Sequence, residues 1–107
     1  MVVRGDVVWA DLGAPVGRRP VCIVTRDAAI GVLSALTCAP VTRTTRGIRS
    51  EVAVGREEGL PEAGVITCDN IVTVPKGYLD FRRVGHLGVQ KRIELDAALR
   101  FALDVQY

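Results

Sequence analysis

The sequence predicts an α+β domain in which a small, barrel-like β-sheet is followed by a single C-terminal helix. Two observations predict this class. Short runs of β-branched residues alternate with glycine- and proline-containing turns as far as Leu87, and neither glycine nor proline occurs from Val89 onward. With 107 residues, 49% of them hydrophobic, the chain can build one modest core. We therefore expect residues 1–107 to form a single domain.

The expected strands are short apolar runs that end at turn residues. Pro20 suits the first position of the second strand, because proline cannot donate a hydrogen bond to a β-ladder. We expect a short helix or a wide turn over residues 26–34, and either one bent strand or two strands around Asp69-Asn70. The expected strands span residues 6–12, 20–24, 36–41, 51–54, 65–68, 71–74 and 84–87.

The last part of the chain is predicted to form an amphipathic helix. Oppositely charged residues recur every four positions, which places them together on one face where neighbours attract. Apolar residues recur at the same spacing, and we expect their face to pack against the sheet. The charged face comprises Arg92, Asp96, Arg100 and Asp104, and the apolar face comprises Ile93, Ala97, Phe101 and Val105, with Leu95, Leu99 and Ala102 nearby.

Cysteine and histidine usage argues against a metal site. The chain has three cysteines and one histidine, without a Cys-x-x-Cys pair. Cys22, Cys38 and Cys68 lie in apolar, β-rich stretches, so we expect buried free thiols in a reducing compartment. No apolar run is long enough to cross a membrane, and the N-terminus lacks the apolar core of a signal peptide. We expect a cytoplasmic protein without a cofactor.

Positive charge is small in total but unevenly distributed. The formal net charge is +2, yet twelve of the 14 basic residues are arginines. Arg18 and Arg19 are adjacent, and Arg43, Arg46 and Arg49 fall within seven residues. Arginine suits bidentate phosphate contact and base stacking better than lysine does. Because Arg19 and the later cluster flank strand ends, we interpret them as phosphate contacts rather than as merely solvated side chains.

Two short strings place a guanidinium and a hydroxyl where predicted strands meet polar loops. Arg19 precedes Pro20 and Val21, and a residue before proline is biased toward an extended conformation. Thr42 ends the string Ala39-Pro40-Val41-Thr42, which leads into the arginine-rich loop. Such a set of groups can bind a phosphate and stabilise charge that develops on it without a metal ion.

Through these motifs and their order, the chain resembles the MazF/PemK-type toxins of bacterial toxin–antitoxin pairs. The matching elements are residues 4–12, 17–21, 39–42, 65–71 and 84–87 and the helix ending at residues 102–104. The resemblance implies an SH3-like β-barrel (MazF/PemK/CcdB-like) with a C-terminal helix, a homodimer, and inhibition by a cognate antitoxin. It also implies metal-independent cleavage of single-stranded RNA at short sequences, the activity of an endoribonuclease called an mRNA interferase.

The resemblance assigns the catalytic arginine to Arg19 and the catalytic threonine to Thr42. Attack of the RNA 2′-hydroxyl on the adjacent phosphorus would leave a 2′,3′-cyclic phosphate and a 5′-hydroxyl, while both side chains stabilise the new charge. Arginine is a poor base near neutral pH, so the proton-transfer group stays open between Asp69, Glu51 and His86. Of these, His86 lies in an apolar strand and is expected to be structural.

The RNA contacts are predicted mainly in the loop that follows the third strand. Trp9 is either a stacking platform for bases or an aromatic residue of the barrel core. Two departures from the family pattern concern the RNA sequence that is read: the loop over residues 13–17 carries no acid, and Asn70-Ile71-Val72 replaces a Gln-Ile-basic string. The expected RNA-binding residues are Arg18, Arg43, Thr44, Thr45, Arg46, Arg49 and Asn70.

Two other functions stay open at the level of the sequence. A gyrase-binding toxin of the same barrel type depends on an apolar tail with a Trp-Gly-Ile ending, whereas this chain ends Asp104-Val105-Gln106-Tyr107. A non-catalytic SH3-like binding module would not need the Arg-Pro-Val and Pro-Val-Thr strings together, although the fold alone does not exclude it.

Overall fold

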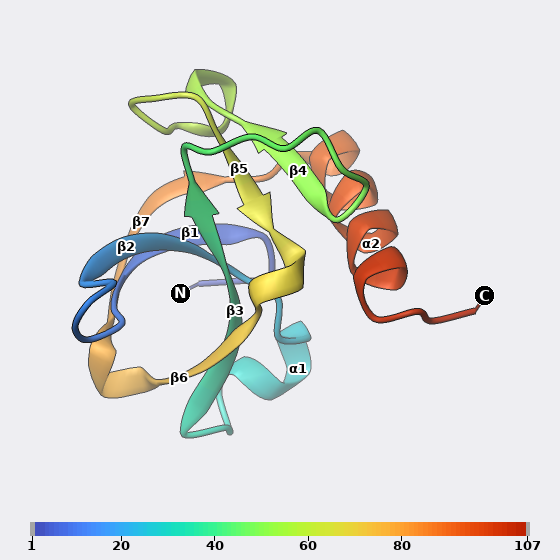
Figure 1. Ribbon diagram of the computed structural model, residues 1–107. Coiled ribbons are helices and arrows are strands. Elements are labelled where there is room, and N and C mark those ends of the chain that lie inside the picture. The colour runs from blue at the N-terminus through green and yellow to red at the C-terminus, as the bar shows by residue number, and fades with distance from the viewer. Residues whose placement is uncertain (1, 107) are drawn as a thin grey trace.

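The computed structural model describes residues 2–106 and shows a strongly curved antiparallel sheet with one long helix packed against it (Figure 1). The strands follow the order β4-β5-β3-β2-β1-β7, and β6 pairs with β3. Within the described residues β4 and β7 form no ladder, so the sheet is barrel-like without being closed. The strands are β1 (Asp6–Asp11), β2 (Arg18–Ile23), β3 (Ala35–Thr42), β4 (Glu51–Val54), β5 (Gly64–Thr67), β6 (Val72–Pro75) and β7 (Leu79–His86).

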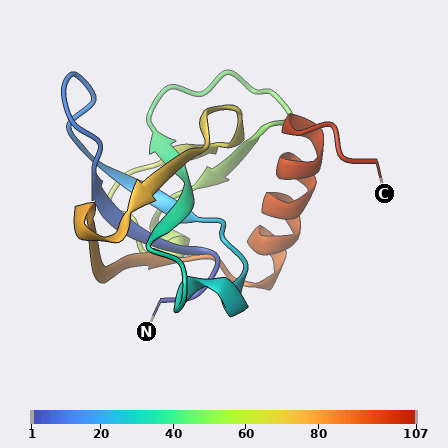
Figure 2. The same cartoon turned by 90° about the horizontal axis from the view of Figure 1, so that it is seen from below.

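Helical segments are few, and only one of them is long. Figure 2 shows the β1–β2 hairpin and the long helix at opposite sides of the molecule. The helical segments are α1 (Asp27–Ile30), α2 (Val89–Ala102) and the 3₁₀ turns η1 (Arg56–Glu58), η2 (Cys68–Asn70) and η3 (Lys76–Tyr78). This architecture confirms the predicted α+β class with a barrel-like sheet and a C-terminal helix. The first and last residues of the predicted 1–107 domain lie outside the described residues.

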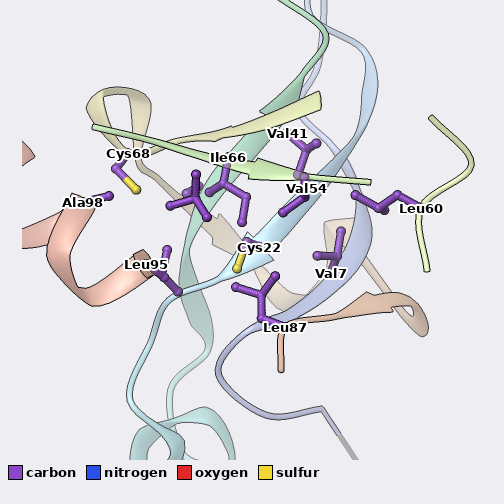
Figure 3. Packing of buried hydrophobic residues seen from close by; sticks show 12 residues of the cluster. Val7, Cys22, Val41, Val54, Leu60, Ile66, Cys68, Leu87, Leu95 and Ala98 are labelled. Carbon is purple, nitrogen blue, oxygen red and sulfur yellow. The ribbon is translucent and has the colours of Figure 1, made fainter. Parts of the chain in front are cut away.

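The sheet buries apolar residues on both of its faces. One cluster lies between the sheet and α2, where Leu95 and Ala98 reach toward Cys22, Ile66 and Cys68 (Figure 3). A second cluster lies on the other face, with Ile23 and Leu36 at its centre and Ile30 of α1 at its edge. Burial of each large aliphatic side chain contributes about 1.5–3 kcal/mol to folding.

The face of α2 that packs on the sheet differs from the predicted one. Ile93 is 55% exposed and Phe101 46%, whereas Leu95 is fully buried and Ala98 is 3% exposed. The expectation that Ile93, Ala97, Phe101 and Val105 pack against the sheet is therefore wrong. The helix carries two apolar stripes, and the stripe through Leu95 and Ala98 packs, because its small residues allow a close approach and its leucines fill the core.

Two strands begin two or more residues earlier than expected. β2 begins at Arg18, so Pro20 is its third residue and not its first. β7 begins at Leu79 rather than near residue 84, because the charged residues Asp80, Arg82 and Arg83 interrupt the apolar run that predicts a strand. Around Asp69-Asn70 the expectation of two separate strands is confirmed, since η2 separates β5 from β6. β5 pairs with the end of β3, and β6 pairs with its beginning.

The three cysteines are free and buried, as predicted. Burial raises the pKa of Cys22 and of Cys38 to about 12 and that of Cys68 to about 11, so the thiols keep their protons at neutral pH. In residues 2–106 no helix is both long and apolar enough to traverse a bilayer.

Candidate active site

An open groove of about 490 Å³ lies where the ends of β2 and β3 meet the loop that leads into β5. Three of its lining residues are arginines, and Glu62 is the one carboxylate among those described. The groove therefore presents net positive charge. The lining residues are Trp9, Arg18, Arg19, Pro20, Val41, Thr42, Arg43, Thr44, Leu60, Pro61, Glu62, Ala63, Gly64 and Val84.

Arg19 and Thr42 come from neighbouring strands and line the same groove. The β2–β3 ladder ends at the pair of Val21 with Pro40. Arg19 and Thr42 each lie two residues beyond that pair, where both strands reach the groove. Both residues are partly exposed, so their polar groups are open to a ligand.

The backbone of Thr42 is held by β5. Thr42 pairs with Val65, and a Cβ built on Gly64 would lie 2.6 Å from the carbonyl oxygen of Thr42. Only glycine permits this approach without a shift of the backbone. The Thr42 hydroxyl donates a long, 3.5 Å hydrogen bond to the carbonyl oxygen of Thr44, a contact that a stronger acceptor would replace.

The loop between β4 and β5 is fastened to β7 before it reaches the groove. A Cβ built on Gly85 would lie 2.5 Å from the carbonyl oxygen of Glu58, so glycine is required there. Gly59 has φ +92°, which also favours glycine. Leu60 is 4% exposed and belongs to the cluster under α2. Residues 61–63 are thus held between this anchor and Gly64.

Trp9 lies in the groove beneath Arg18 and is not sealed in the core. The Arg18 guanidinium carbon lies 5.2 Å from the centre of the Trp9 ring, within range of a cation–π contact. Arg18 Nη2 also lies 3.4 Å from Asp80 Oδ2, which accepts a 2.6 Å bond from Arg82 Nη2. The hydrogen bonds from Arg82 hold the pKa of Asp80 well below its usual range.

The opposite wall carries the ion pair of Arg43 and Glu62. Arg43 Nη2 lies 2.5 Å from Glu62 Oε2, although both side chains are largely exposed. Arg43 directly follows β3, and Glu62 belongs to the anchored loop, so the pair links the two segments that flank Thr42. An acid therefore lies in the groove although the loop over residues 13–17 has none.

Other residues of the predicted RNA-binding loop lie outside the groove lining. The exposed Thr45 and Arg46 follow Thr44, and the Arg46 backbone N–H donates to the Glu51 carboxylate at 3.0 Å. The Arg49 guanidinium carbon lies 4.4 Å from the centre of the Phe101 ring, against α2. The loop therefore runs from the groove toward the C-terminal helix, as Figure 1 shows for the segment between β3 and β4.

Asn70 and the three predicted proton-transfer candidates also lie away from the groove lining. Asn70 ends η2, which contacts α2 and β3. Asp69 Oδ2 accepts a 2.5 Å hydrogen bond from the Ser50 hydroxyl, and the Glu51 carboxylate accepts backbone N–H groups at residues 46 and 47. His86 Nδ1 lies 2.6 Å from Oδ1 of the fully buried Asp6, in keeping with a structural histidine.

Sequence reasoning did not single out the wall formed by residues 60–64. These residues belong to a segment predicted only as a loop, and no motif marks them. One usable signal was Leu60, an apolar residue between Gly59 and Pro61, because an apolar residue flanked by turn formers can anchor a loop in the core.

The fold and the groove together define a barrel-like α+β protein with an arginine-rich site suited to phosphodiesters. The sequence matches the family of PemK-like, MazF-like toxins of type II toxin–antitoxin systems over residues 3–103, and the chain belongs to this family.

Relatives and solved structures agree with this membership. Endoribonuclease MazF3 of Mycobacterium tuberculosis is 37% identical over 89 residues, covering 83% of this chain and 85% of that protein. Probable endoribonuclease MazF5 of the same organism is 35% identical over 102 residues, 94% of this chain and 92% of that protein.

Two solved structures show the same fold over almost the whole chain. The structure of M. tuberculosis toxin MazF-mt6 has a TM-score of 0.87 at 34% identity and covers 95% of this chain and 99% of that one. A mycobacterial endoribonuclease in complex with its cognate antitoxin has a TM-score of 0.89 at 29% identity, and the match covers 100% of this chain and 99% of that one.

Proposed function

We propose that this chain is the endoribonuclease toxin of a toxin–antitoxin pair, acting in the cytoplasm on single-stranded RNA. The observation that carries the proposal is the placement of Arg19 and Thr42 on adjacent strands in one basic groove. Relatives at 35–37% identity are named endoribonucleases, which supports RNA cleavage as the activity.

In the proposed reaction the 2′-hydroxyl of the ribose attacks its own 3′-phosphodiester. As the new bond forms, the 2′-hydroxyl gives up its proton to water in the open groove. The bond to the 5′-oxygen of the next nucleotide breaks, and that oxygen takes up a proton, which gives a 2′,3′-cyclic phosphate and a 5′-hydroxyl. Arg19 holds the non-bridging oxygens through its planar fork, and the Thr42 hydroxyl donates a further hydrogen bond to them. Both contacts strengthen as charge develops on these oxygens, so the chemistry needs no divalent cation.

Substrate binding is proposed to extend from the groove along the basic loop. Arg18, Arg43 and Thr44 line the groove itself. Thr45, Arg46 and Arg49 continue toward α2 and would contact more distant phosphates, and Asn70 lies near that end of the path. Single-stranded RNA suits such a site, because an unstacked base can displace the Arg18 guanidinium and lie on the partly exposed Trp9 ring.

A homodimer and an antitoxin are the proposed protein partners. Val89, Ile93 and Ala97 form an exposed apolar stripe at four-residue spacing on α2, and Phe101 continues it beneath the Arg49 guanidinium. A second copy related by a two-fold axis would cover this stripe. A solved relative with 29% identity is a complex with its cognate antitoxin. We propose that the antitoxin of this chain blocks the groove with an acidic segment that orders on binding.

Cleavage rates of two groove variants test the proposal. Arg19→Ala and Thr42→Ala are each expected to lower the cleavage rate of single-stranded RNA by about 100- to 1,000-fold, because each removes one donor to the developing charge. Arg26→Ala, which changes an exposed arginine outside the groove lining, is the matched control and should retain the wild-type rate. Wild-type cleavage by a folded Arg19→Ala protein would overturn the site assignment.

A further inference from the structure

We propose that Glu62 reads the exocyclic amino group of one nucleobase and thereby excludes uracil from one position of the cleaved sequence. This inference rests on the proposed RNA cleavage and concerns which sequence is cut. The juxtaposition that carries it is a carboxylate, paired with an arginine, on a fixed wall of the groove that holds Arg19 and Thr42.

A carboxylate is an unexpected group in a groove that binds a polyanion. It accepts hydrogen bonds only, and phosphate oxygens offer it no donor and repel it electrostatically. Base amino groups are donors, carried by adenine, cytosine and guanine but not by uracil. Both exocyclic groups of uracil are carbonyl oxygens, which a carboxylate repels, and its one base-edge donor, N3–H, lies between them. Acidic side chains accordingly accept hydrogen bonds from amino groups of this kind, as in the contact of glutamate with cytosine N4.

The ion pair does not enclose the Glu62 carboxylate. The closest approach of the pair is Arg43 Nη2 to Glu62 Oε2, and the Glu62 side chain stays 57% exposed, so its carboxylate is open to a ligand. With the carboxylate as acceptor and the remaining Arg43 N–H groups as donors, the pair presents an acceptor beside a donor. Adenine and cytosine complement this pattern, because their amino group stands next to an unprotonated ring nitrogen. Uracil also offers N3–H beside a carbonyl oxygen, but its second carbonyl oxygen then faces the carboxylate and is repelled.

The wall that presents Glu62 is fixed at both ends. Gly59 and Gly85 bring the loop into contact with β7, and Leu60 is buried in the core. On the other side Gly64 lies against the carbonyl oxygen of Thr42. Specific reading of a base needs a polar group held by a rigid support, and this loop provides one.

Stability alone gives little reason for the pair. Its side chains are 81% and 57% exposed, and exposed ion pairs contribute about 0–1 kcal/mol. Trp9 lines the same groove, and a base that displaces the Arg18 guanidinium from its ring could stack there.

Sequencing of cleaved ends from a randomised single-stranded RNA pool tests the inference. The full chain, Glu62→Ala, Glu62→Gln and the control Glu57→Ala are compared, since Glu57 is an exposed glutamate of the same loop outside the groove lining. Wild type and control should discriminate against uracil at one position by about tenfold or more. Glu62→Ala should lose that discrimination there alone, and Glu62→Gln, which keeps an acceptor oxygen, should retain part of it.

A defined substrate gives the second readout. When the amino group at that position is replaced by hydrogen, kcat/KM should fall for the wild-type protein and stay unchanged for Glu62→Ala. An unaltered sequence profile in Glu62→Ala would overturn the inference while leaving the proposed function in place. The inference would also be overturned if Glu62→Ala lost rate equally on every sequence and showed a changed pH profile, because that result would assign Glu62 to proton transfer. Intact RNA with the wild-type protein would overturn both.

Discussion

Gly64 of β5 lies so close to Thr42 of β3 that a Cβ on the glycine would be 2.6 Å from the threonine carbonyl oxygen. The contact belongs to the β3–β5 ladder, in which Thr42 pairs with Val65. The position of the proposed catalytic hydroxyl is therefore set by a residue that has no side chain. Gly64 also ends the wall that carries Glu62, so one close approach fixes both sides of the groove.

Replacement of Gly64 by alanine should impair catalysis through Thr42. The added methyl forces β5 away from β3, which costs about 1–3 kcal/mol of stability and shifts the Thr42 hydroxyl. We expect kcat for RNA cleavage to fall by about tenfold or more, because small displacements of a catalytic group are costly. Gly77→Ala is the control, since a Cβ there meets nothing within 4 Å. Equal activity of the two variants would contradict this account.

The two apolar stripes of α2 should respond differently to truncation. Leu95→Ala removes a fully buried side chain and should lower the free energy of unfolding by about 2–5 kcal/mol. Ile93→Ala changes a side chain that is 55% exposed and should cost less than about 1 kcal/mol in the monomer. Urea unfolding at low protein concentration measures both. A larger loss of unfolding free energy in Ile93→Ala than in Leu95→Ala would instead support the packing face predicted from the sequence.

The uncovered stripe of α2 should control association. Ile93→Asp places a charge on the surface proposed to meet a second copy, and burial of an unpaired charge is strongly unfavourable. We expect sedimentation to show a folded monomer for this variant and a dimer for the wild type. The control is Val32→Asp, which changes an apolar residue that is 81% exposed and distant in sequence from α2. The protein with this substitution should remain dimeric. Dimers of Ile93→Asp at the wild-type affinity would exclude this interface.

Alkaline pH should destabilise the protein through its buried thiols. Burial raises the pKa of Cys22 from 9.0 to about 12, so the unfolded thiol loses its proton before the folded one does. The unfolded state then binds fewer protons, and the free energy of unfolding falls as pH rises from about 9 toward 12. Each such thiol contributes up to about 1.4 kcal/mol per pH unit. Urea unfolding of Cys22→Ala at several pH values should give a shallower slope, and an unchanged slope would refute the assignment.

Local chemistry made much of the fold predictable. Glycine and proline mark the turns, and β4 was placed at residues 51–54 as the structure has it. The packing face of α2 was not predictable in this way, because Ile93 and Leu95 are equally apolar and only tertiary contact decides between two stripes. The start of β7 is not predictable in the same way, because charged residues interrupt the apolar run in its first half.

The residues of the site that lie at the ends of strands were predictable from the sequence. Arg19 and Thr42 each stand where an apolar strand meets a polar loop, and the register of β2 and β3 brings them to one groove. Glu62 escaped prediction because its position depends on the docking of a loop onto β7, a contact between residues far apart in sequence. Arg49 illustrates the same limit, since its stacking on Phe101 depends on where α2 lies.

The termini left by cleavage test the central claim most directly. Single-stranded RNA is incubated with the full chain in excess EDTA, and both new ends are identified by mass spectrometry. The account predicts 2′,3′-cyclic phosphate and 5′-hydroxyl ends, because the ribose hydroxyl is the nucleophile and the protein supplies only guanidinium and hydroxyl donors. Ends with a 3′-hydroxyl and a 5′-phosphate, or cleavage that occurs only when a divalent cation is restored, would contradict it.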